Sequence, residues 1–287
     1  MEPEIIADCS CRTGEGPLWH PLDQKLYWVD IPAGKLFRWN PANGQVETCI
    51  GGGDAIGGFT VQPDGALLLF MARGAIKLWR EGQVTTVVAE IPEEREGRFN
   101  DVIADPKGRV FCGTMPSGTR QGSLYLLDTA GALTRVLDDA GLSNGMAFSP
   151  DRTKFFHTDS ARRVIREFDF DEASGAITNP RAFVEVPGGG EVPDGLTVDA
   201  EGYLWSARWD GSCLVRYAPD GAEDRRVAFP AKKVSCATFG GPGYDELYVT
   251  TAGGDQKVED GPGAGALFRL RPGVRGVPEF FSRIHVG

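Results

Sequence analysis

The chain has 287 residues, of which 41% are hydrophobic and 24% charged, and its 30 basic and 40 acidic side chains give a formal net charge of −10. This acidic balance, without any block of Lys or Arg, argues against nucleic acid and anionic membranes as partners. Because no stretch approaches the ~20 apolar residues of a membrane span, and the start does not resemble a signal peptide, we expect a cytoplasmic protein.

Short predicted strands recur along the whole chain, and a tight turn marks each repeat. Successive turns begin 42 to 50 residues apart, at Pro21, Pro63, Pro106, Pro150, Ala200 and Pro242. A period of this length built from short strands is typical of a β-propeller, in which each blade is one four-stranded sheet. The sequence therefore predicts an all-β protein, a six-bladed β-propeller that occupies residues 1–287 as a single domain.

The predicted strands follow the same order in every blade. Residues 4–7 come first and are expected to complete the last blade, because ring closure removes exposed sheet edges. An innermost strand precedes each turn and carries apolar residues at alternate positions, such as Phe59 and Val61. The second strand of each blade is predicted at residues 26–29, 66–70, 110–112, 155–157, 203–206 and 247–250. The third is predicted at residues 35–39, 75–79, 123–127, 164–168, 213–217 and 266–270, and the weaker fourth, for instance, at 46–50 and 84–88.

One position of the repeat, six residues before each turn, is polar in four of the six blades. It is occupied by Glu15, Gly57, Asn100, Asn144, Asp194 and Cys236. Equivalent positions of a propeller lie on a ring around its axis, so Glu15, Asn144 and Asp194 are predicted to converge on one point. An acid or amide before glycine is by itself a common turn, but three such turns have no reason to share one register.

Oxygen donors of this kind predict a site for a hard divalent cation. Glu15 and Asp194 would supply two carboxylates that balance the charge of the ion, and Asn144 would add a neutral carbonyl. Because three protein ligands leave coordination positions open, a catalytic site is favoured over a structural one. Asn100 shares the register, and it either ligates the ion or binds substrate beside it.

Arg98 lies two residues before Asn100 and is expected to face the same mouth of the channel. Its guanidinium would hold substrate hydroxyl or carbonyl oxygens there, and the alternative is a surface ion pair with Asp101 or Glu96. Asp101 itself is interpreted as a supporting or hydrogen-bonded structural acid. The six cysteines lack the paired spacing of a zinc site, so Cys236 is interpreted as a small buried hydrophobic residue.

Two further residues have interpretations from the sequence alone. His157 ends a predicted strand and is expected to be packed structurally rather than to take part in catalysis. Trp209 would either stack on a sugar face or cover the rim of the propeller.

Five segments, in order along nearly all the chain, resemble the signature segments of the gluconolactonase and regucalcin (senescence marker protein) family. They are GEGPLW at 14–19, RFND at 98–101, SNG at 143–145, PDG at 193–195 and FGG at 239–241. The resemblance implies a six-bladed propeller with a divalent metal ion in its channel. It also implies metal ligation by Glu15, Asn144 and Asp194, and substrate contact by Arg98 and Asn100. Animal members carry a substrate-reaching glutamate where this chain has TMPSGTR, at 114–120.

The same resemblance implies a metal-dependent hydrolase that opens the ester ring of a sugar lactone and yields the aldonic acid. Asp194 is expected to act as the general base toward water, while the ion polarises the lactone carbonyl. Calcium is the favoured ion, with zinc, manganese, magnesium and iron as alternatives, and the partner is a small sugar lactone. The alternative functions are a metal-dependent esterase or organophosphate hydrolase, and a non-catalytic calcium-binding propeller.

Overall fold

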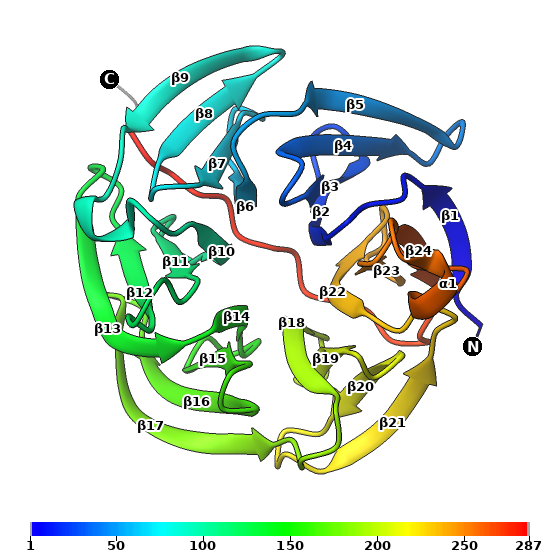
Figure 1. Ribbon diagram of the computed structural model, residues 1–287. Coiled ribbons are helices and arrows are strands. Elements are labelled where there is room, and N and C mark those ends of the chain that lie inside the picture. Colours follow the sequence, from blue (N-terminus) through cyan, green and yellow to red (C-terminus); the bar gives the residue numbers. More distant parts are fainter. Residues whose placement is uncertain (1, 286–287) are drawn as a thin grey trace.

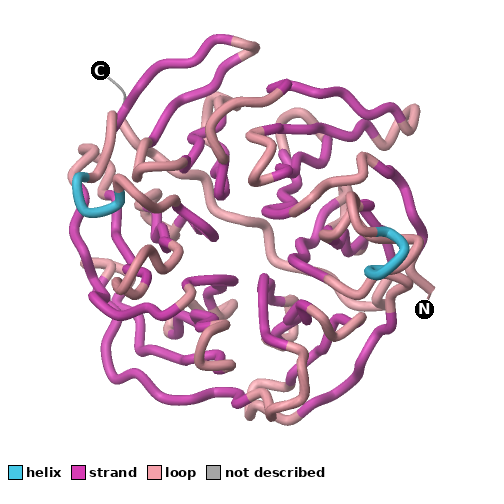
Figure 2. The backbone as a smooth tube through the Cα atoms, viewed as in Figure 1, coloured by secondary structure: helices cyan, strands magenta, loops and turns pink. Residues whose placement is uncertain are grey.

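The computed structural model describes residues 2–285 and consists of six four-stranded sheets arranged in a ring around a central axis (Figure 1). The six-bladed β-propeller predicted from the repeat is confirmed. Among these residues, helix is confined to a 3-10 turn, η1 (Pro92–Glu94), and one short helix, α1 (Lys257–Asp260), both at the periphery of the ring (Figure 2). Neither has the length or the apolar character needed to cross a bilayer.

Each blade begins at the axis and ends at the rim. The innermost strands are β2 (Gly14–His20), β6 (Ile56–Val61), β10 (Phe99–Ala104), β14 (Ser143–Phe148), β18 (Val192–Val198) and β22 (Val234–Gly240). The second strands are β3 (Lys25–Asp30), β7 (Leu67–Met71), β11 (Val110–Thr114), β15 (Lys154–Asp159), β19 (Leu204–Trp209) and β23 (Glu246–Thr251).

The outer half of each blade completes the pattern. The third strands are β4 (Lys35–Asn40), β8 (Ile76–Arg80), β12 (Gly122–Leu127), β16 (Val164–Asp171), β20 (Cys213–Tyr217) and β24 (Ala266–Leu270). The outermost strands are β5 (Gln45–Gly51), β9 (Gln83–Val88), β13 (Leu133–Gly141), β17 (Ala176–Glu185), β21 (Glu223–Ala228) and β1 (Glu4–Asp8). The second, third and fourth strands predicted from the sequence begin within one residue of these elements.

The ring is closed by β1, which is the first strand of the chain but the outermost strand of the last blade. It pairs with β24 in antiparallel register, from Glu4 opposite Arg269 to Asp8 opposite Ala266. The pairing confirms the closing strand predicted at residues 4–7. It joins the two ends of the repeat, so the last blade does not present an unpaired edge.

An irregularity interrupts the pairing of every innermost strand at the repeat position that carries the predicted ligands. The register between β2 and β3 shifts after Glu15, between β14 and β15 after Ser143, and between β18 and β19 after Pro193. The same break occurs in the other three blades. A bulge of this kind bends its strand and changes the direction of a side chain. The six equivalent repeat positions therefore share the same local distortion of the backbone.

Near the axis, neighbouring innermost strands approach so closely that some of their glycines could not carry a Cβ atom. A Cβ at Gly145 would lie 2.2 Å from the backbone nitrogen of Leu196, and one at Gly195 would lie 2.4 Å from Sγ of Cys236. The residue after the shared repeat position is Gly or Ala in five blades, with Asp101 as the exception. Asp101 thus places an acidic side chain at a position where the other blades have only a hydrogen atom or a methyl group.

The hydrophobic core lies between neighbouring blades. Tyr27 of the first blade packs in one cluster with Phe59 and Val61 of the second, and the latter two are 3% exposed. Between the fifth and sixth blades, the rings of Trp205 and Phe239 meet edge to face with their centroids 6.2 Å apart. The alternate apolar residues of the innermost strands are thus buried against the next blade, which fixes the positions of the polar residues between them.

After β24 the chain crosses the propeller axis (red in Figure 1). Gly276 forms a bridge with Asp199 of the fifth blade, and the backbone N–H of Ser282 donates to the carbonyl oxygen of Val61 in β6. Between these attachments, Glu279 and Phe280 line a cavity of about 60 Å³ in the channel. We call residues 271–285 the C-terminal strap, because they close one mouth of the channel.

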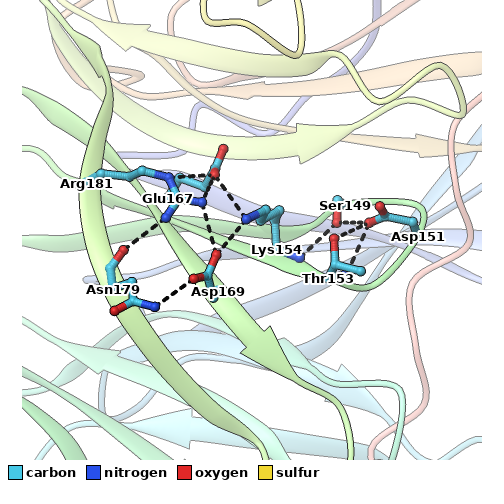
Figure 3. Close-up of polar contacts among 8 residues, drawn as sticks. All are labelled: Ser149, Asp151, Thr153, Lys154, Glu167, Asp169, Asn179 and Arg181. Carbon is cyan, nitrogen blue, oxygen red and sulfur yellow. Dashed lines mark hydrogen bonds and ion pairs between the residues drawn. The ribbon is translucent and has the colours of Figure 1, made fainter.

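The outer strands of the fourth blade carry a network of surface ion pairs (Figure 3). Nζ of Lys154 lies 2.5 Å, and Nη2 of Arg181 3.0 Å, from Oδ1 of Asp169. Hydrogen bonds from Lys154, Asn179 and Arg181 hold the pKa of Asp169 below its ordinary value. Exposed pairs of this kind contribute little to stability. The residues of this network do not line the cavity described below.

Candidate active site

The mouth of the channel opposite the C-terminal strap opens into a cavity of about 290 Å³. Four blades contribute its wall, which consists of Thr13, Glu15, Ile31, Arg98, Asn100, Met115, Leu142, Asn144, Ser160, Val192, Asp194 and Trp209. All five residues that the sequence predicts for the site are among them. They come from the beginnings of β2, β10, β14 and β18, which the propeller brings together from positions far apart in the sequence.

A continuous series of hydrogen bonds orients the polar side chains of this wall. Nη1 of Arg98 donates to Oδ1 of Asn100 at 2.7 Å, and Nδ2 of Asn100 donates to Oδ1 of Asn144 at 3.0 Å. Nδ2 of Asn144 donates to Oγ of Ser160 at 2.9 Å, and that hydroxyl donates to the carbonyl oxygen of Pro193 at 2.6 Å. These bonds fix both amides, and the carbonyl oxygen of Asn144 keeps a second lone pair for a further partner.

Arg98 faces the cavity and not the surface. Burial lowers its pKa, while the nearby Glu15, Asp101 and Asp194 carboxyls act in the opposite direction. Across residues 2–285, the ion pairs do not include one between Arg98 and either Asp101 or Glu96, so the surface-pair alternative is not what the structure shows. The guanidinium is the one cationic group in the cavity wall and is available to oxygen atoms of a ligand.

Glu15 and Asp194 bring two carboxyl groups, 4% and 5% exposed, to the same cavity. Burial, followed by repulsion from the Asp101 carboxyl, raises the pKa of both well above the ordinary range. Burial also raises the pKa of Asp101, to about 7. Three acids confined in this way cannot all ionise without a compensating positive charge. The two carboxylates and the amide oxygen therefore form a donor set that fits a hard divalent cation.

A tighter cluster lies beside this donor set. Glu15, Asp101 and Cys236 each offer one atom, and the three atoms lie within 4.8 Å of one another. The sequence left Asp101 and Cys236 outside the predicted ligand set. Two signals pointed to them: Asp101 is the charged exception at a position of small residues, and Cys236 occupies the same repeat position as Glu15.

His157 and Trp209 occupy different environments. His157 is fully buried in the fourth blade with Nε2 2.8 Å from Oγ of Ser143, and burial lowers its pKa to about 4. The ring is therefore neutral and away from the cavity wall, which agrees with the structural role expected for it. Trp209 lines the cavity, and Nζ of Lys233 lies 5.7 Å from the centre of its ring.

An ion pair between Glu94 and Arg120 joins the segment before β10 to the segment after β11. Glu94 of η1 is fully buried, accepts a hydrogen bond from Nη1 of Arg120 at 2.7 Å, and accepts another from Oη of Tyr125 at 2.9 Å. Arg120 ends a turn closed by a bridge to Ser117, and the same segment carries Met115 of the cavity wall. The segment 114–120 thus contributes an apolar side chain to the wall, in place of an acidic one.

Several known proteins are similar to this chain along nearly its whole length. The chain matches the model of the SMP-30/Gluconolactonase/LRE-like region over residues 13–253, a range that contains all five predicted site residues. A pentonolactonase from Haloferax volcanii is 46% identical, over 98% of this chain and 98% of that protein.

Two solved structures have the same fold along nearly the whole chain. The calcium-binding protein regucalcin from Agrobacterium tumefaciens gives a TM-score of 0.89 at 27% identity, covering 98% of this chain and 97% of that one. A gluconolactonase from Xanthomonas campestris gives a TM-score of 0.77 at 25% identity, covering 94% of this chain and 89% of that one.

Proposed function

Because this chain belongs to the SMP-30/gluconolactonase/LRE-like family, we infer that it is a lactonase, a carboxylic ester hydrolase that opens the ring of a sugar lactone. Similarity to a pentonolactonase and to a gluconolactonase supports this activity. Within the structure, the observation that carries it is the convergence of two buried carboxyls, two amides and one guanidinium on a single cavity.

The lining of the cavity favours a sugar over an apolar ester. Seven of the twelve wall residues are polar, and Trp209 is the single aromatic residue among them. A ligand with several hydroxyl groups can pair with these polar side chains, whereas an apolar organophosphate would leave them unpaired. We expect a five-carbon lactone to be the preferred substrate, since the relative from Haloferax volcanii is a pentonolactonase.

We further propose that Glu15, Asn144 and Asp194 hold one divalent ion, with calcium as the first candidate. Their oxygen donors suit calcium, manganese or magnesium, and the similar Agrobacterium tumefaciens protein is a calcium-binding one. When bound, such an ion supplies Lewis-acid polarisation of the lactone carbonyl and lowers the pKa of water.

The side chains of this protein would perform the remaining tasks. Arg98 and Asn100 bind oxygen atoms of the lactone and so orient its carbonyl carbon toward Asp194. Asp194 accepts a proton from water as the water oxygen bonds to that carbon. When the bond between the carbonyl carbon and the ring oxygen breaks, the proton passes to the ring oxygen, which becomes a hydroxyl. One lactone and one water thus yield one hydroxy acid, and Asp194 returns to its starting state.

A turnover assay tests this proposal. Protein stripped with chelator is mixed with pentono- and hexonolactones, a simple aryl ester and an organophosphate, before and after each divalent ion is restored. Acid release is followed with the spontaneous rate subtracted. We expect lactone opening only after an ion is restored, and fastest for a pentonolactone. Turnover of the ester or the organophosphate alone would assign the rival hydrolase activity, and ion binding without any turnover would assign a non-catalytic calcium-binding propeller.

A further inference from the structure

Three side chains from the first, third and sixth blades meet at one point of the channel. Glu15 of β2, Asp101 of β10 and Cys236 of β22 offer two carboxylate oxygens and one sulfur within 4.8 Å of one another. They are 4%, 8% and 8% exposed. Because their strands belong to different blades, no single turn accounts for the cluster. Two carboxylates and a thiol at this spacing have the composition of a mixed oxygen and sulfur metal site.

Among residues 2–285, the carboxylate of Asp101 has no hydrogen-bond donor of its own. The guanidinium of the nearby Arg98 donates instead to the carbonyl oxygen of Phe99 and to Oδ1 of Asn100. A buried carboxylate without donors is costly, and this one faces the axial cavity of about 60 Å³. Since one water needs only ~10–15 Å³ of such space, the cavity has room for a cation and a water ligand.

The position of the Cys236 sulfur is fixed by its neighbours. Gly195 approaches so closely that a Cβ there would lie 2.4 Å from Sγ. The sulfur lies 3.9 Å from the carbonyl oxygen of Ala237, a long and weak contact for a thiol. The thiol is therefore held beside Glu15 and Asp101 without being committed to a strong hydrogen bond. It also lines the same cavity as Asp101.

We propose that Glu15, Asp101 and Cys236 form a second cation subsite that takes a thiophilic divalent ion such as Cd²⁺ or Zn²⁺. Sulfur favours soft and borderline ions, whereas the oxygen donors of Asn144 and Asp194 favour hard ones. On binding, the ion forms a bond to Sγ, and the thiol proton is released to solvent. Water from the axial cavity supplies the fourth position of a tetrahedral set. Because Glu15 belongs to both subsites, the two ions compete for its carboxylate.

Titration with Cd²⁺ tests the subsite without any lactone, so its result is separate from that of the hydrolysis assay. Metal-stripped full-length protein is titrated while the ultraviolet charge-transfer band of cadmium thiolate is recorded. We expect a band that saturates at about one equivalent. Cys236→Ser should abolish it, and Asp101→Asn should weaken binding by about tenfold or more, the lower limit seen for groups that support a metal ligand. The band should persist after replacement of the half-buried Cys9 and Cys49 by serine.

A second measurement on the unmodified protein guards against loss of folding in the variants. The ¹¹³Cd resonance of the one-equivalent complex should fall in the range of sites with one sulfur ligand. A resonance in the oxygen-only range, or a full charge-transfer band in a folded Cys236→Ser protein, would overturn the proposal. Melting curves of the metal-free variants establish that they are folded, and Cys236→Ala replaces Cys236→Ser where serine destabilises the core.

Discussion

Asp194 and Asn144 lie on neighbouring blades and line the same cavity. Substitution of each residue removes a different chemical group from that cavity. Asp194 is a buried carboxyl that can accept a proton, whereas Asn144 offers a neutral oxygen. The partners of Asn144 have other contacts: Oγ of Ser160 also bonds to Pro193, and Nδ2 of Asn100 also donates to the carbonyl oxygen of Ser143. Loss of the Asn144 amide therefore leaves few groups unpaired.

We expect Asp194→Asn to lower lactone turnover by about 10² to 10⁴ even at saturating metal, because the general base is lost while an oxygen remains near the ion. Asn144→Ala should instead weaken ion binding, so excess metal should recover part of its activity. Both follow from hydrolysis rates measured against metal concentration. Near wild-type turnover of Asp194→Asn at high metal would show that Asp194 is only a ligand.

The predictable part of the site is the part that follows the repeat. Glu15, Asn100, Asn144 and Asp194 share one register, so counting along the chain is enough to place them on one ring. The role of Asp101 does not follow from counting, because it depends on which way a charged side chain turns at a crowded axis. The hydrogen bonds that orient the amides likewise depend on side-chain geometry across blades.

At the level of the elements, strand order and strand starts follow from turns and alternation, but the breaks in pairing do not. The register shift after Glu15 has counterparts in the other five blades. Nothing in local propensity distinguishes a bulged strand from a regular one here. The shift arises because the innermost strands must bend toward the axis while their apolar residues stay between blades.

The C-terminal strap is the second element that the repeat did not predict, and it carries an acid of unusual pKa. Burial raises the pKa of Glu279 from 4.5 to about 7. Tyr244 lies near it, and burial together with the Glu279 carboxyl raises the pKa of Tyr244. Asp101 and Cys236 line one cavity with Glu279, and Arg152 lines another. The folded protein therefore holds this proton more tightly than the unfolded chain.

Stability of the metal-free protein should consequently depend on pH through Glu279. Below about pH 4.5, Glu279 is protonated in both the folded and the unfolded state, so it does not lower the free energy of unfolding. As the pH rises toward 7, the carboxyl ionises first in the unfolded state, and the free energy of unfolding falls. Glu279→Gln removes this loss, so its melting temperature relative to wild type should rise between pH 4.5 and pH 8. Melting curves in chelator at both pH values measure the difference. A difference that is the same at both pH values would contradict the raised pKa of this half-buried Glu279.

On the scale of the whole molecule, the proposed ion joins the first, fourth and fifth blades through Glu15, Asn144 and Asp194. Such a site exists only when the blades are assembled, so the ion binds the folded chain and not the unfolded one. At a free concentration 100 times its dissociation constant it should stabilise the protein by roughly 2.7 kcal/mol. Calorimetry with chelator and then with added calcium measures this effect. A melting temperature indifferent to both would show that ion binding is not coupled to assembly of the ring.

We propose above that one hard divalent ion lies among Glu15, Asn144 and Asp194 at the open mouth of the channel. Anomalous diffraction from crystals grown with Mn²⁺ tests it most directly. We expect one strong peak at roughly 2.0–2.6 Å from a carboxylate oxygen of Glu15, Oδ1 of Asn144 and a carboxylate oxygen of Asp194. A peak that contacts neither Asn144 nor Asp194, or the absence of any ordered ion in the cavity at saturating Mn²⁺, would contradict it.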